Sequence, residues 1–75
     1  MYMVNKKENF RYLNDNYITT KNELVLNLIG KAYCIGEFVD GSVNAYVVSG
    51  KKIESVWTVT ESEREIYDKA LYGIA

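Results

Sequence analysis

The sequence predicts a small α+β domain in which a three-stranded antiparallel meander precedes a C-terminal helix. Three observations support this fold class. Residues 31–60 are rich in β-branched and aromatic residues and are divided by two glycine-containing turns. Residues 61–72 carry apolar residues at helical spacing. The third observation is length, because 75 residues suffice for one small domain, over residues 1–75, and are too few for two.

The best-defined element is the helix predicted over residues 61–72. Thr60 and Glu63 have the spacing of a capping box, in which two side chains satisfy backbone N–H groups at the helix start. Gly73 stands where a left-handed terminating residue is expected. The apolar residues that follow the cap recur on one face of such a helix: Ile66, Tyr67, Ala70, Leu71 and Ile74.

The predicted meander has strands over residues 31–39, 43–49 and 52–60. Asp40-Gly41 is typical of a two-residue type I′ hairpin turn, which needs positive φ at both central positions. That turn would fix the register of the first two strands and place Cys34 opposite Val47. For the next turn, near residues 49–52, we favour an even number of loop residues, because a three-residue loop would turn every side chain of the third strand over.

With this register both faces of the sheet are apolar. One face would carry Tyr33, Ile35, Tyr46, Val48, Ile53, Trp57 and Val59. The other would carry Ala32, Cys34, Phe38, Val43, Ala45, Val47 and Val56. The C-terminal helix can cover one face only, and large exposed apolar patches are rare on monomers. Either residues 1–30 or another protein chain must therefore cover the second face.

Residues 1–30 allow two interpretations. Thr20 and Glu23 repeat the capping-box spacing, which favours a short helix over residues 21–29 that ends at Gly30. Alternatively, a turn at Lys21-Asn22 joins two strands, over residues 17–20 and 23–29. The run Asn14-Asp15-Asn16 reads better as a turn than as a helix interior. Residues 1–8 are a candidate for disorder.

Composition argues against several function classes. The chain has no histidine, one cysteine and a formal net charge of -1. It therefore lacks the commonest general base and any thiolate metal cage, and we expect no enzyme activity, no metal, no cofactor and no small-molecule substrate. Cys34 is interpreted as a buried structural thiol. The near-neutral charge disfavours nucleic acid. No segment is long and apolar enough to span a membrane, and we expect a cytoplasmic protein.

The remaining hypothesis is a small non-enzymatic domain that binds another protein or a second copy of itself. Candidate contact residues are the aromatics Tyr33, Tyr46 and Trp57, with Glu61, Glu63 and Glu65 as an alternative acidic surface. Phe, Tyr, Met, Ile, Asn and Lys make up 31 of 75 residues, a bias typical of AT-rich genomes. This bias suggests a phage or mobile-element factor that inhibits or modulates a host protein.

Two other functions fit the same residues. The aromatic sheet could stack on the bases of a single-stranded nucleic acid, although only Lys31, Lys51 and Lys52 supply positive charge in the middle segment. The two-sided sheet would equally suit a structural subunit of a larger assembly.

Overall fold

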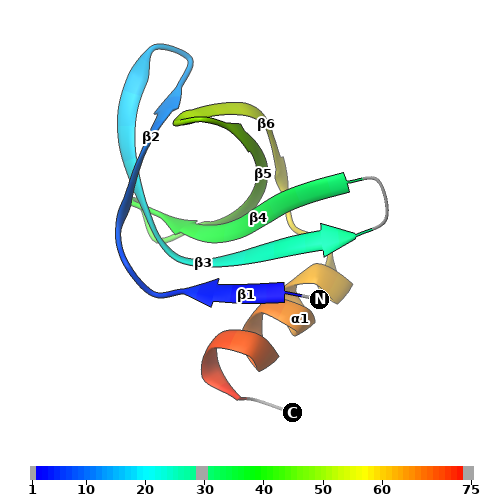
Figure 1. Cartoon of the computed structure of the whole chain (residues 1–75). Helices are drawn as coiled ribbons and strands as arrows, with labels where there is room; N and C mark the ends of the chain where they lie inside the picture. The colour runs from blue at the N-terminus through cyan, green and yellow to red at the C-terminus, as the bar shows by residue number, and fades with distance from the viewer. Residues whose placement is uncertain (1, 29–30, 74–75) are drawn as a thin grey trace.

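The computed structural model describes residues 2–28 and 31–73, which form six strands and one helix (Figure 1). The elements are β1 (Tyr2–Asn5), β2 (Asn9–Leu13), β3 (Asn16–Leu28), β4 (Lys31–Phe38), β5 (Val43–Ser49), β6 (Lys52–Thr58) and α1 (Glu61–Tyr72). All strand pairs are antiparallel except β2 with β6.

Five of the strands close into a barrel. Each of β2 to β6 pairs with the next along the chain, and β6 returns to β2. The closing contact is short: Tyr12 pairs with Lys52, and the Tyr12 N–H donates to the Lys51 carbonyl at 2.7 Å. Figure 1 looks along the barrel, with β1 and α1 outside the ring of strands.

The predicted fold class was wrong. The three predicted strands exist as β4, β5 and β6, and the helix over residues 61–72 is confirmed as α1. However, they belong to a five-stranded barrel rather than to an isolated meander, because β2 and β3 complete the sheet and bring its two edges together. Barrel closure removes sheet edges, which an open three-stranded sheet would leave exposed.

The helix predicted over residues 21–29 was also wrong, since residues 16–28 form the single strand β3; residues 29 and 30, including the expected stop at Gly30, lie outside the described residues. The strand is irregular where the alternative interpretation placed a turn: Asn22 has a φ of 54°, and the register with β4 shifts between Lys21 and Leu24. A β-bulge there bends β3, so the strand lines two sides of the barrel.

Two strands near the N-terminus pair with the same edge of β3. Residues 2–5 form β1, which pairs with residues 23–26, whereas β2 pairs with residues 16–20 further along the same edge of β3. Asn14 and Asp15 make the turn between β2 and β3 and have φ values of 49° and 69°. These are type I′ values, so the tight hairpin turn occurs here and not at Asp40-Gly41.

The turn between β4 and β5 has three residues. The Phe38 N–H donates to the Ser42 carbonyl at 2.8 Å, and the Gly41 N–H donates to the Phe38 carbonyl at 2.9 Å. Gly41 alone of the loop has positive φ, at 87°, which is the pattern of a type I turn followed by a left-handed bulge residue. The register is therefore one residue away from the predicted one, and Cys34 faces Tyr46 rather than Val47.

Each predicted face of the meander therefore combines residues that lie on opposite faces of the observed sheet. Ser49 pairs with Lys52, which leaves the even two-residue loop that was predicted. A register shift then inserts Glu54, so that Val48 pairs with Ile53 while Val47 pairs with Ser55. A bulge residue reverses the side-chain alternation of the strand after it, and Ile53 and Trp57 accordingly point to opposite faces.

Helix α1 packs against the outside of the barrel wall. Its start is the predicted capping box: Thr60 Oγ1 accepts from the Glu63 N–H at 3.2 Å, and the Glu63 carboxylate accepts from the Thr60 N–H at 2.9 Å. Gly73 is left-handed, as predicted. The helix and the wall bury one apolar cluster: Leu24, Leu26, Tyr33, Ile35, Ala45, Tyr67 and Leu71.

Both apolar faces of the sheet are covered within the described residues. Helix α1 covers the outer face, and closure of the barrel by β2 and β3 turns the second face into the barrel interior, where Tyr46 and Ile53 are buried. Of the two alternatives that the sequence left for the second face, the structure therefore shows the N-terminal segment and not another chain. Helix α1, with 12 residues, is too short to cross a bilayer.

The capping box predicts a measurable share of stability. Thr60→Ala removes the side-chain oxygen that accepts from the Glu63 N–H, and we expect a loss of about 1 kcal/mol in the free energy of unfolding. Urea denaturation measures this loss. Ser62→Ala is the matched control, because Ser62 is exposed in the same helical turn, and equal losses in both variants would contradict a specific role for the cap.

Candidate functional site

A buried carboxylate lies inside the barrel. Glu23 is 1% exposed, and it follows the bulge residue Asn22, so its side chain points to the barrel interior while Leu24 faces the helix cluster. An isolated ionised carboxylate would be very costly there, and it is tolerated only when hydrogen-bonded and paired with a positive charge.

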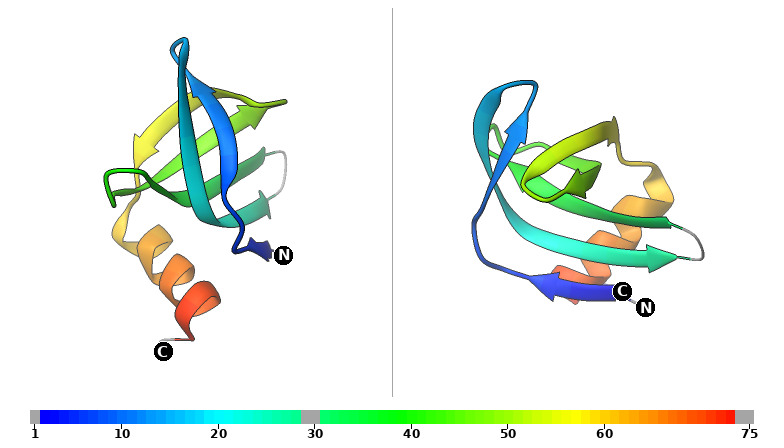
Figure 2. Two further views of the ribbon diagram at one scale, coloured as in Figure 1. Left: turned by 90° about the vertical axis from the view of Figure 1, so that its left-hand side faces the viewer. Right: turned by 45° about the horizontal axis from the view of Figure 1, so that its top comes forward.

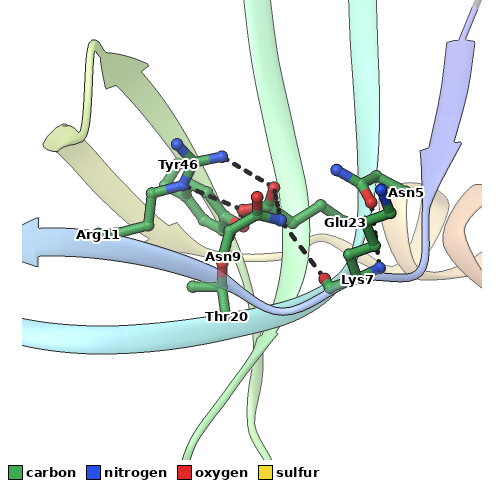
Figure 3. Close-up of polar contacts among 7 residues, drawn as sticks. All are labelled: Asn5, Lys7, Asn9, Arg11, Thr20, Glu23 and Tyr46. Carbon is green, nitrogen blue, oxygen red and sulfur yellow. Dashed lines mark hydrogen bonds and ion pairs between the residues drawn. The ribbon is translucent and has the colours of Figure 1, made fainter.

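Donors from three strands satisfy Glu23 (Figure 3). Oε1 accepts from Asn9 Nδ2 and from an Arg11 terminal nitrogen, both at 2.9 Å. Oε2 accepts from Thr20 Oγ1 at 2.7 Å, from Arg11 Nε at 3.3 Å and from the Tyr46 hydroxyl. The network therefore joins β2, β3 and β5 across the barrel. We call these five residues the Glu23 network.

The network keeps Glu23 ionised. Burial by itself would raise the pKa of Glu23, but hydrogen bonds from Arg11, Tyr46 and Thr20 outweigh it and hold that pKa below its ordinary value of 4.5. Burial and the adjacent Glu23 carboxylate raise the pKa of Tyr46. Cys34 is partly buried, and this burial raises the pKa of its thiol.

Among the described residues, no buried side-chain polar atom of this network lacks a hydrogen-bond partner, and the network connects three strands, so we interpret it as structural. Its tight fit depends on Gly36 of β4. A Cβ atom at Gly36 would lie 2.5 Å from the Tyr46 hydroxyl and 3.2 Å from Glu23 Cγ. A glycine is therefore required for space at this position.

The exposed candidate surface is on the other side of the β2–β3 hairpin. Phe10, Tyr12 and Tyr17 are 53%, 45% and 54% exposed. The Tyr17 ring stacks on Tyr12, with centroids 4.6 Å apart, and on Phe10, with centroids 5.5 Å apart. We call these three residues the aromatic strip. The β2–β3 hairpin that carries it ends away from α1 (Figures 1 and 2).

The strip forms because β2 has an inverted pattern. Its inward positions are Asn9, Arg11 and Leu13, and its outward positions are Phe10 and Tyr12. The polar residues point inward because Glu23 needs donors there, and the alternation of a strand then sends the aromatic residues outward. Exposure of these rings is thus a direct consequence of the buried Glu23 network.

A shallow open cavity of about 330 Å³ adjoins the strip. Thr19, the cross-strand partner of Phe10, belongs to its lining and joins the two surfaces. The cavity lies between the β2–β3 hairpin and the β4–β5 loop, and its walls include Glu8, Thr19, Lys21, Glu37, Phe38 and Val39. We call it the Glu8 cavity. Large apolar side chains and two carboxylates therefore lie at one end of the strip.

The aromatic residues predicted to bind a partner are mainly core residues. Tyr46 is fully buried inside the barrel, and Tyr33 is 8% exposed on the opposite face, so the two do not share a patch. Trp57 is partly buried against the helix cluster, with its ring centroid 5.5 Å from that of Tyr33. Burial would raise the pKa of Glu63, but the hydrogen bond from the Thr60 N–H and, to a smaller extent, those with Tyr33 and Trp57 lower it overall.

The acidic candidates lie on the first turns of α1. Glu63 is the capping residue, and Glu61 and Glu65 are exposed. A contact role for Glu61, Glu63 and Glu65 stays a prediction. Sequence reasoning missed the aromatic strip, although one signal was present: Phe10, Tyr12 and Tyr17 flank a turn, and two-residue alternation in β2 puts aromatics on one face of that hairpin.

Among residues 2–28 and 31–73 no group of three or more histidine, cysteine or acidic side chains is placed to hold a metal ion. Comparisons of the chain with protein-family models, curated proteins and solved structures found no significant match.

The Glu23 network predicts a pH dependence of stability. Because the pKa of Glu23 is lower in the folded chain than its ordinary value of 4.5, its contribution is present above about pH 4.5 and is lost as pH falls through the lowered pKa. Glu23→Gln should cost about 3 kcal/mol at pH 7, since it leaves Arg11 without its charge partner. It should also flatten the fall in stability between pH 5 and pH 3.

Urea denaturation over this pH range measures both effects, with Glu54→Gln as a control because Glu54 is exposed on β6. A part of the acid dependence remains in Glu23→Gln, since hydrogen bonds also lower the pKa values of Glu37 and Glu63. Parallel pH curves for wild type and Glu23→Gln would show that Glu23 is not a titrating group of this transition.

The close approach of the Tyr46 hydroxyl to Gly36 predicts that substitutions at these two positions have non-additive effects on the free energy of unfolding. Gly36→Ala should destabilise the chain by about 1–3 kcal/mol, because its methyl group overlaps the Tyr46 hydroxyl. In a Tyr46→Phe background the same substitution should cost clearly less, since the overlapping oxygen is gone. A double-mutant cycle by denaturation measures this coupling. Additive costs would mean that Gly36 is required for a reason other than space for Tyr46.

Proposed function

We propose that the chain is a small non-enzymatic protein-binding domain and that the aromatic strip is its contact surface. The supporting observation is the solvent exposure of three stacked aromatic rings on a hairpin whose inner side is fixed by the Glu23 network. Tyrosine and phenylalanine are enriched at protein interfaces, and rigid rings lose little conformational entropy when they bind.

The exposed area favours a segment of another protein over a second copy of this chain. An aromatic side chain has roughly 200 Å² of surface, so three half-exposed rings offer on the order of 300 Å². A standard interface buries about 800 Å² on each partner. The strip is therefore too small to hold a stable homodimer by itself, and it fits a peptide-like segment that lies along the hairpin.

Single-stranded nucleic acid is the second candidate, because exposed aromatic rings can stack on bases and Lys51 and Lys52 lie beside Tyr12 at the barrel seam. Two observations disfavour it. The rings already stack on one another, which occupies ring faces that bases would need. Acidic residues also stand at both ends of the strip, with Asp15 in the hairpin turn and Glu8 at the cavity.

The wider biological role extends the same proposal. A domain that covers a surface of a host protein and thereby inhibits or modulates it would act in the cytoplasm, and the AT-rich residue bias fits a phage or mobile element. A structural subunit would use the strip in the same way, as a contact within an assembly.

A displayed random-peptide library selected on the full chain tests the proposal. We expect selected peptides whose binding, measured by fluorescence anisotropy, weakens at least tenfold in Tyr17→Ser and in Phe10→Ser, because each variant removes a ring from the contact. Ile66→Ser is the control, since Ile66 is 43% exposed on α1.

Thermal melts of all three variants check that the barrel remains folded. Peptides that bind Tyr17→Ser as well as wild type would overturn the proposal. A labelled single-stranded oligonucleotide that binds wild type and is released by Tyr17→Ser would replace it with the nucleic-acid function.

A further inference from the structure

The Glu8 cavity gives the aromatic strip a charged end. Two carboxylates, Glu8 and Glu37, and one ammonium group, Lys21, line it. Glu37 is already engaged, because Asn22 Nδ2 donates to it at 3.1 Å and the Tyr72 hydroxyl donates to it at 2.8 Å. Lys21 is its cross-strand partner. The remaining carboxylate, Glu8, has neither a hydrogen bond nor an ion pair through its side chain to any described residue.

The other wall of the cavity is apolar. Phe38 at the end of β4 and Val39 of the β4–β5 loop line it, and Val39 is 72% exposed. A long side chain with an aliphatic stem and a charged end, as in lysine or arginine, could cover such a wall with its stem while its cation meets a carboxylate. The lining has two carboxylates against the single ammonium group of Lys21, so its net negative charge favours a partner cation over a partner carboxylate or phosphate.

We propose that the Glu8 cavity receives a lysine or arginine side chain of the protein segment that lies along the aromatic strip. The proposal rests on the proposed function and adds the chemistry of the partner. Glu8 pairs with the partner's cation, Phe38 and Val39 pack against its stem, and the strip takes an apolar residue of the same segment.

The geometry of β3 also sets the spacing. Tyr17, Thr19 and Lys21 are alternate residues, and Tyr17 and Lys21 are about 13 Å apart along a strand with a rise of roughly 3.3 Å per residue. An extended partner segment covers this length with about four residues. The basic residue should therefore stand about four positions from an apolar residue, on the same side of the segment.

Sequencing the peptides selected on the full chain tests this arrangement. We expect enrichment of lysine or arginine about four positions from an aromatic or aliphatic residue. For a synthetic peptide of the consensus sequence, Glu8→Gln should raise the Kd about two- to fivefold, a size typical of an exposed ion pair. Glu54→Gln, which neutralises an exposed carboxylate outside the cavity, should leave the Kd unchanged.

Charge reversal gives an independent test. When the peptide library is selected on the Glu8→Lys variant, the selected peptides should no longer be enriched in lysine or arginine. Adding Tyr17→Ser to that variant should still abolish binding of these new peptides. If the peptides depend on Tyr17 but carry no basic residue, and Glu8→Gln binds them as wild type does, the cavity proposal fails and the strip remains the contact surface. If no selected peptide depends on Tyr17, the proposed function fails and the cavity proposal fails with it.

Discussion

The structure depends on one buried carboxylate and the donors that surround it. Glu23 is held inside the barrel by side chains of β2, β3 and β5, and its partners on β2 and β5 lie 12 to 23 residues away in the sequence. The direct seam between β2 and β6 is short, and this network adds a connection between β2 and β5 across the barrel interior. A hydrophobic interior could be as stable, but a paired charge also specifies which strands meet, because any other pairing would leave it unsatisfied.

The same interaction determines where the chain presents aromatic rings. Arg11 and Asn9 point inward to reach Glu23, and the alternation of β2 therefore places Phe10 and Tyr12 outside. Tyr17 joins them from β3, across the hairpin. A strand that kept its apolar side chains in the core would have left a polar outer surface. The polar interior and the exposed strip are thus two results of one choice of side chains in β2.

The opposite side of the wall illustrates ordinary hydrophobic packing. Leu24, Leu26 and Ile35 meet α1 through Tyr67 and Leu71 in a continuous cluster. The position of the helix follows mainly from its apolar stripe and its capped start, and polar contacts such as the hydrogen bond from the Tyr72 hydroxyl to Glu37 add to this packing. One strand, β3, serves both layers: the bulge at Asn22 separates a half that closes the barrel from a half that carries the helix cluster.

The sequence by itself determined the elements that depend on local chemistry. The capping box and the left-handed Gly73 defined α1, and alternating β-branched residues with turn signals defined β4, β5 and β6. These features depend on neighbours within a few residues, so the printed sequence contains them.

Only the tertiary structure decided barrel closure, the assignment of β3 and the location of the candidate site. The spacing of Thr20 and Glu23 predicts a helix cap, yet the two side chains meet inside a barrel, because a hydrogen bond at that separation does not require a helix. Leu24 and Leu26 of β3 are buried and Val25 between them is partly buried, so this apolar run lacks the alternation of a half-exposed strand and resembles a helix in sequence. Whether an aromatic side chain is buried in the core or exposed as a contact residue depends on which strands pair with its own strand. That pairing joins residues far apart in the sequence.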